Sequence, residues 1–244
     1  MIKFRNYLSI FLILMGIQQV HAQDSTVVSD FELWTGVQLK KSFLEDKLTA
    51  GLTQEFRFND NSTSINNFFT EVELGYEFYK GIRVDAGYRF IRNNRKSGYL
   101  NEGRFFADLN YKHKLDRFKF SYRFRYQNQS ALGDVVDDDV VNKYRLKFKA
   151  EYNIRKWKLD PYFAVEGFFA QTTNNINYIA TITESERVSG FEKLRFTIGT
   201  EYNFNKKISL GGFYRYEREL GSFPLNYNTS RNYFIAGVNL KFDL

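Results

Sequence analysis

The stretch RFKFSYRFRYQN, residues 117–128, decides the fold class, because aromatic and polar side chains alternate along it. The stretch YRLKFKAEYNI, residues 144–154, repeats the alternation. Successive side chains of a β-strand point to opposite faces, so a period of two gives one apolar and one charged face. Strands of soluble proteins usually span about 5–6 residues, whereas tilted strands that cross a bilayer need about 9–11. These long segments therefore predict a transmembrane β-barrel.

The alternation recurs in eleven segments after the first 30 residues. We expect strands at approximately 31–41, 47–59, 67–79, 82–92, 102–113, 117–128, 142–155, 158–171, 190–204, 207–218 and 230–244. Single-chain bacterial barrels normally have an even number of strands. Either residues 23–30 add a twelfth strand, which we favour, or the N-terminal part threads the lumen and about ten strands close the barrel. The predicted fold class is all-β, a closed antiparallel up-and-down transmembrane barrel of about 10–12 strands.

The connections fall into two groups by length. Short ones are expected near 80–81, 114–116, 155–157 and 205–207, and long ones near 60–66, 93–101, 129–141, 172–189 and 219–229. Outer-membrane barrels have short periplasmic turns and longer extracellular loops. We therefore expect the long connections to face outward.

Both ends of the chain carry export features. Lys3 and Arg5 precede a short apolar run at residues 7–17, which predicts a signal peptide at 1–22 and a single barrel domain at 23–244. Apolar residues alternate to the last position, and Gly237 followed by Leu240 and Phe242 resembles the terminal signal for barrel insertion. The expected location is the outer membrane of a Gram-negative cell, with lipid, lipopolysaccharide and the barrel-insertion machinery as partners.

Composition agrees with a barrel and argues against other classes. Cys is absent, which excludes disulfides and thiolate metal sites, and only two Pro occur, as long paired strands require. The mean hydropathy of −0.47 fits strands that are apolar at every second position. The net charge of +7 comes from basic residues that alternate with Phe and Tyr, which favours a charged lumen over a nucleic-acid surface. No cofactor or metal is expected.

The polar face of each strand is expected to line the lumen. The predicted charge lining is Glu71, Glu73, Arg83, Arg89, Arg104, Asp108, Arg123, Arg125, Arg145, Lys147, Glu166, Lys193, Arg195, Arg215 and Glu217. Glycine spacing predicts hairpin registers that pair Gly75 with Gly87 and Gly199 with Gly211. These registers put Glu73 opposite Arg89 and Lys193 opposite Glu217. In other hairpins, allowed registers bring Asp108 near Arg123 and Lys147 near Glu166. Such a lining is either anion-selective or neutralised by its own carboxylates.

Few residues fit a pattern for catalysis. His113 is the only histidine after the signal, and no serine stands beside it; the nearest candidate, Ser121, is on the next strand. Glu71, Glu73 and Glu77 share a face, but arginines on the neighbouring strand favour ion pairs over acid–base chemistry. No catalytic residue is predicted.

Other prominent residues have structural interpretations. Trp34 and Trp157 are expected to anchor the barrel at the membrane interfaces. A group of acidic residues in one long loop favours a solvated surface over a divalent-cation site. These residues are Asp134, Asp137, Asp138 and Asp139.

Three short motifs resemble a known family. They are DFELW at residues 30–34, QEFRF at 54–58 and GYRF at 87–90. Through them, nearly all of 30–244 resembles an uncharacterised family of bacterial outer-membrane β-barrels, of Bacteroidota type, known only as a domain of unknown function. The resemblance implies a barrel and an outer-membrane location, and it supplies no substrate or catalytic residue.

The function that these patterns favour is non-enzymatic. We expect a monomeric, porin-like barrel whose narrow lumen passes or binds small polar or anionic solutes. The alternative is a structural or adhesive barrel whose loops, above all 129–141 and 172–189, bind an external partner. A lipid hydrolase that uses His113 and a soluble periplasmic barrel are further alternatives.

Overall fold

The computed structural model describes residues 26–96, 98–133, 140–178, 182–219 and 229–244, apart from the side chains of Thr26, Thr229 and 173–187. The expected signal peptide at 1–22, residues 23–25 and the acidic loop residues 134–139 lie outside the described residues. Within these ranges, no helix is long and apolar enough to cross a membrane.

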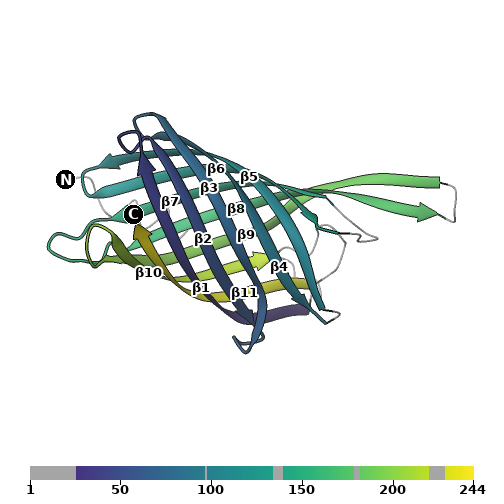
Figure 1. Ribbon diagram of the computed structural model, residues 1–244. Helices are drawn as coiled ribbons and strands as arrows, with labels where there is room; N and C mark the ends of the chain where they lie inside the picture. The colour runs from purple at the N-terminus through teal and green to yellow at the C-terminus, as the bar shows by residue number, and fades with distance from the viewer. Residues whose placement is uncertain (1–25, 97, 134–139, 179–181, 220–228) are drawn as a thin grey trace, which may run out of the picture.

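The described residues form a single closed β-barrel (Figure 1). Its strands are β1 (Thr26–Phe43), β2 (Leu48–Asn59), β3 (Ser64–Tyr79), β4 (Ile82–Arg95), β5 (Gly98–Leu115), β6 (Phe118–Ala131), β7 (Val141–Tyr152), β8 (Tyr162–Tyr178), β9 (Ile182–Asn203), β10 (Ile208–Glu219) and β11 (Thr229–Asp243). Each expected segment matches one of these strands. The predicted all-β, closed and mostly up-and-down barrel is therefore confirmed.

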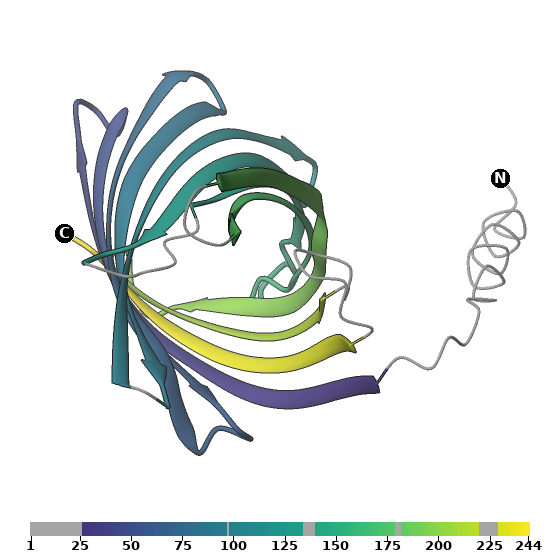
Figure 2. The same cartoon turned by 90° about the vertical axis from the view of Figure 1, so that its right-hand side faces the viewer.

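The barrel closes through a parallel pairing of its first and last strands. Strand β1 pairs with β11 from Thr26↔Thr229 to Lys40↔Asp243, and the two ribbons run side by side in Figure 2. The expectation of an even strand number was wrong for the described chain. Residues from Thr26 onward extend β1 itself, so they add no twelfth strand and do not thread the lumen. An odd number of up-and-down strands makes the first and last run the same way, which requires this parallel closure.

The two ends of the barrel differ in shape. We call the end that carries Leu244 the C-terminal mouth, and the opposite end the hairpin mouth. At the hairpin mouth, β8 and β9 extend as a ribbon past the other strands (Figure 1), with pairing that continues to Tyr178↔Ile182.

Two connections expected to be long were wrong. Most of 172–189 belongs to β8 and β9, and most of 93–101 belongs to β4 and β5. Polar, Asn-rich composition favours a loop, but the backbones of β8 and β9 pair through this stretch all the same. On the other side, the connection 153–161 at the C-terminal mouth is longer than expected.

The two faces of the wall have opposite character, as the alternation predicts. On β6, Arg125 and Gln127 are buried inside the barrel, whereas Phe124 is exposed on the outer surface. The strands on either side of β6 show the same arrangement, because residues paired across neighbouring strands lie on the same face of a sheet. Ionic side chains therefore face the lumen and apolar ones cover the exterior.

Inward glycines admit aromatic rings from adjacent strands. The ring of Phe106 occupies the space where a Cβ on Gly87 would lie, and Phe213 does the same over Gly237. The expected glycine-to-glycine registers were wrong by two residues, because Gly75 pairs with Asp85 and Gly199 with Phe213. Each glycine accommodates bulk from its neighbour rather than pairing with a second small residue.

Gly237→Val should test this packing. A Cβ at Gly237 overlaps the Phe213 ring, so we expect the free energy of unfolding to fall by about 1–3 kcal/mol. Urea unfolding in lipid micelles, followed by tryptophan fluorescence, measures the change. Gly212→Val on the neighbouring strand is the matched control, since nothing lies within 4 Å of its Cβ. Equal effects for both variants would contradict the packing argument.

Candidate functional site: the charged lumen

All fifteen residues of the predicted charge lining lie on the inner face, on strands β3 to β10. Sequence reasoning missed the lumen residues of β1, β2 and β11. These include Glu32, Trp34, Glu55, Arg57, Tyr233 and Lys241. The period of two could have found them. Trp34 lies two residues after Glu32 on β1, so both side chains are on the same face of the strand.

The lumen holds three cavities in series. A hairpin vestibule of about 660 Å³ lies at the hairpin mouth, a waist of about 350 Å³ follows, and a C-terminal vestibule of about 520 Å³ lies at the C-terminal mouth. Trp34 and Arg57 line both the hairpin vestibule and the waist, whereas Arg123 and Lys147 line both the waist and the C-terminal vestibule. Each cavity therefore adjoins the next along the barrel.

At the waist, one carboxylate compensates three guanidinium groups. Glu166 is 2% exposed, and it accepts hydrogen bonds from Arg123 Nη2 at 2.6 Å, Arg145 Nε at 3.0 Å and Arg195 Nη1 at 3.2 Å. The network continues to Glu217, which lies 2.6 Å from Arg195 Nη2. Such charge-assisted bonds hold the side chains in fixed positions across β6 to β10.

Two further pairs join adjacent strands at the same level. Arg125 donates to both oxygens of Asp108, at 2.6 and 2.7 Å, and its guanidinium lies over the Phe106 ring. Arg89 pairs with Glu71 at 2.6 Å. Asp108 was expected to meet a different arginine, and Glu71 takes the partner expected for Glu73, because the true registers are offset by two residues.

Several lumen cations make no ion pair with any described residue. Lys147 is the register partner of Glu166, as expected, but three arginines already occupy that carboxylate. Arg104 donates to the amide oxygen of Gln129 at 2.8 Å, and Arg215 donates to the Thr197 hydroxyl at 3.2 Å. These three charges are solvated or hydrogen-bonded rather than neutralised.

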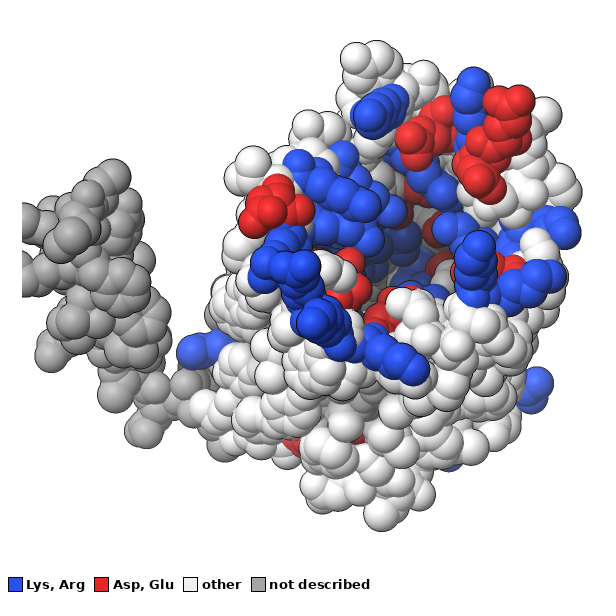
Figure 3. All heavy atoms as spheres, turned by 90° about the vertical axis from the view of Figure 1, so that its left-hand side faces the viewer, with Lys and Arg blue, Asp and Glu red and all other residues white. Residues whose placement is uncertain are grey.

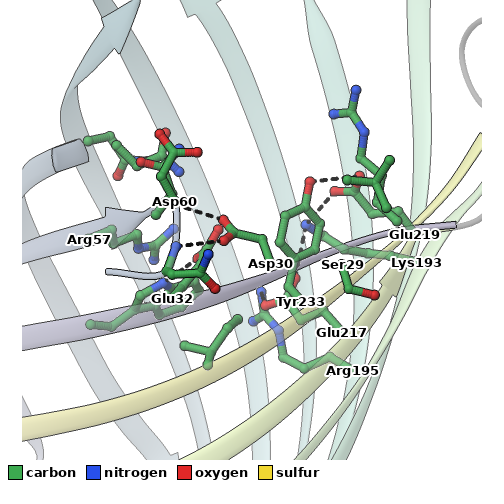
Figure 4. Close-up of a pocket in the computed structure, with 18 residues that line it drawn as sticks. Ser29, Asp30, Glu32, Arg57, Asp60, Lys193, Arg195, Glu217, Glu219 and Tyr233 are labelled. Atoms are coloured by element: carbon green, nitrogen blue, oxygen red, sulfur yellow. Dashed lines mark hydrogen bonds and ion pairs between the residues drawn. The ribbon is translucent and has the colours of Figure 1, made fainter. Parts of the chain in front are cut away.

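The hairpin vestibule has balanced charge (Figure 4). Its carboxylates have partners: Asp30 accepts from the backbone N–H groups of Asp60 and Asn61, and Lys193 bridges Glu217 and Glu219. Five acidic residues and four cationic ones line this cavity.

Trp34 does not anchor an interface, so that expectation was wrong. It is 6% exposed inside the lumen, where its Nε1 donates to Glu32 at 2.7 Å and the guanidinium of Arg57 lies 3.7 Å from the ring centroid. Trp157, by contrast, is exposed in the connection 153–161.

Beyond the hairpin vestibule, positive charge exceeds negative charge. Eleven cationic residues and four acidic ones line the waist, and six cationic residues and three acidic ones line the C-terminal vestibule. Figure 3 shows the C-terminal mouth hollowed, with Lys and Arg gathered around the hollow. The lumen therefore has an electrostatic direction, from a balanced vestibule to a basic one.

The two residues considered for hydrolysis lie on opposite sides of the wall. His113 is on the outer face among the rings of Tyr111, Phe120 and Tyr122, whereas Ser121 is on the inner face. His113 lies near the end of β5, in agreement with the strand expected at 102–113. The three glutamates of β3 were expected to form ion pairs with arginines of the neighbouring strand. Glu71 does so with Arg89, but Arg83 pairs with Asp85 on its own strand.

Comparisons with known proteins identify the family. Residues 31–222 match the family model described as a protein of unknown function (DUF2490). The chain belongs to this family. No protein of curated function matches. Among solved structures, the barrel is similar to the alcaligin outer membrane receptor FauA of Bordetella pertussis, with a TM-score of 0.35 and 13% identity over 82% of this chain. The aligned region corresponds to 37% of that receptor.

Glu166→Gln should destabilise the barrel strongly. It leaves three arginines without their shared charge, and removing one partner of a buried ionic group costs about 3–5 kcal/mol. Glu201→Gln is the control, because the pair of Glu201 with Lys241 is about one-third exposed and contributes at most about 1 kcal/mol. Urea unfolding in micelles compares the two, and similar small losses would contradict the role of Glu166.

Proposed function

We propose that this chain is a non-enzymatic outer-membrane barrel whose lumen binds and passes small anions. The observation that carries the proposal is the excess of lumen cations without a carboxylate partner among the described residues, namely Lys147, Arg104 and Arg215. Cationic side chains that line a pore favour anions.

The outer surface supports a membrane location. Large apolar side chains are exposed around the wall, among them Val72, Leu74, Phe105, Leu146 and Ile198. Stacked rings form a band near the C-terminal mouth that includes Tyr111, Phe118, Phe120, Tyr122 and Tyr152. An apolar belt bordered by aromatic rings is typical of outer-membrane barrels.

The proposed orientation puts the hairpin mouth outside the cell. Outer-membrane barrels have their longer segments on the extracellular side, and the β8–β9 ribbon projects from this mouth. The basic C-terminal vestibule then faces the periplasm. Lipid and lipopolysaccharide would contact the apolar belt, and the insertion machinery would act on β11.

A matched pair of arginine substitutions tests the membrane location. Leu146 and Leu115 are 66% and 65% exposed, but Leu146 lies mid-strand and Leu115 at the end of β5 near the C-terminal mouth. In a bilayer, Leu146→Arg should cost about 2–4 kcal/mol and Leu115→Arg about 0–1 kcal/mol. Unfolding titrations of the refolded barrel in lipid vesicles measure both. Equal tolerance of both substitutions would contradict a bilayer around the waist.

Planar-bilayer recording tests passage. In a potassium chloride gradient, the reversal potential should have the sign of chloride selectivity, and Arg104→Gln and Arg215→Gln should each reduce the anion-to-cation permeability ratio. Arg155→Gln is the control, since it removes the same charge from the connection 153–161 and lines none of the three cavities. Cation selectivity, or no conductance at any polarity and salt concentration, would overturn the proposal.

The β8–β9 ribbon favours a second candidate function, the binding of an external partner. Its pairing from Thr172↔Val188 to Tyr178↔Ile182 holds a two-stranded ribbon that extends past the other strands. Replacing 174–186 by a short turn should abolish retention of proteoliposomes on immobilised glycans or matrix proteins while chloride current stays unchanged. Retention that survives this replacement would contradict the second candidate function.

A further inference from the structure

Ser121 is a small side chain at the centre of a basic part of the inner face. Its register partners are Lys112 on β5 and Lys149 on β7. Arg123 lies two residues further along β6. Lys147, the register partner of Arg123, is the diagonal neighbour of Ser121 on β7. Register partners have their Cβ atoms about 4.5–5.5 Å apart and diagonal neighbours about 7–8 Å, within reach of long side chains. Four cations therefore surround a position that fills little space, and all five residues line the C-terminal vestibule.

Several hydrogen-bond donors around Ser121 have no acceptor among the described residues. Lys112 and Lys147 form no ion pair there, and the Ser121 hydroxyl forms no hydrogen bond. Arg123 gives Nη2 to Glu166 at 2.6 Å, but its buried Nε has no partner. A buried donor without an acceptor costs free energy, which a bound acceptor recovers.

The carboxylates of the vestibule have other partners. Glu151 is shared by Lys119 at 3.2 Å and Lys149 at 2.7 Å. Glu201 pairs with Lys241 at 2.7 Å. Asp160, in the connection 153–161, accepts from the Asn153 amide at 3.1 Å and makes no ion pair with either free lysine. The charges of Lys112 and Lys147 therefore remain uncompensated beside Ser121.

We propose that this part of the C-terminal vestibule is a binding site for a divalent tetrahedral oxyanion: phosphate, sulfate or the phosphoryl group of a small phosphate ester. Lys112 and Lys147 neutralise its two charges, while the Ser121 hydroxyl and Arg123 Nε donate to its oxygens. The inference rests on the proposed function in one respect, that small anions enter the lumen.

Charge and shape favour a divalent oxyanion over a carboxylate or a halide. A monovalent anion leaves one of the two lysine charges uncompensated, and a halide has no separate oxygens for donors that converge from three strands. Charge-assisted hydrogen bonds to an ionised oxygen are stronger than those between neutral groups. A lysine ammonium group also suits a tetrahedral phosphate, because it is a compact charge whose donors can turn toward oxygens in any direction.

Calorimetric titration of the purified protein in detergent micelles, in phosphate-free buffer at pH 8, tests the site. The probes are inorganic phosphate, sulfate, acetate and chloride. Phosphate and sulfate should bind at least about tenfold more tightly than acetate or chloride. Equal affinity for divalent and monovalent anions, or no binding of phosphate and sulfate, would overturn the proposal.

Variants locate the binding. Lys112→Gln and Lys147→Gln should each weaken phosphate binding at least about tenfold, and Ser121→Leu should abolish it by filling the space without changing the charge. Arg231→Gln removes a cation from the opposite, hairpin vestibule and should leave the affinity unchanged. An equal loss in Arg231→Gln would mean that overall lumen charge, and not this site, attracts phosphate. If Ser121→Leu does not fold, the two lysine variants decide the question.

Block of chloride current separates this inference from the proposed function. Phosphate added on the side of the C-terminal mouth should reduce chloride current in the unmodified barrel and not in Lys147→Gln. Anion-selective current with neither block nor calorimetric binding overturns the site and leaves the anion pore intact. Calorimetric binding without any current supports the site and overturns passage.

Discussion

Charge compensation inside a closed cylinder is the interaction on which the rest of this structure depends. A wall with an apolar outer face turns the ionic side chains of its strands inward, where they are partly removed from water and must find partners. Glu166 has the largest share of this task, since Arg123, Arg145 and Arg195 all converge on it. Because these residues come from four neighbouring strands, the same contacts that neutralise charge also hold β6 to β9 in their mutual register.

Carboxylates are unevenly distributed along the lumen, and this gives the barrel a direction. At the hairpin mouth they match the cations, whereas at the waist and the C-terminal mouth cations are in excess. A field of one sign inside walls of low dielectric constant concentrates ions of the opposite sign. The parallel closure of β1 and β11 contributes to the balance at the hairpin mouth, because it brings Asp30 and Glu32 of β1 into the vestibule that holds Glu217.

How far the sequence predicts this structure depends on which property is asked for. The period of two assigns a face to each residue, so the strand segments and the inward position of residues such as Arg125 and Glu166 follow from it. The odd strand number and the parallel closure do not, because they depend on how residues from Thr26 onward pair with β11. Register does not, because a shift of two residues keeps every face and changes every partner. Asp108 therefore meets Arg125 rather than Arg123. Parity with Glu32 places Trp34 inside the lumen, whereas the general preference of tryptophan for membrane interfaces predicts the wrong face.

Unpaired lumen cations are informative because this chain has other ways to fill space. Phe213 over Gly237 closes part of the bore with an aromatic ring and requires no charge at all. Where a lumen has only to be filled, such packing or complete ion pairs cost less free energy than a buried Arg123 Nε without an acceptor beside a small serine. The incomplete pairing around Ser121 thus connects the sequence pattern to function. Alternation turns the cations inward, three arginines occupy the carboxylate opposite Lys147, and the proposed anion completes the set.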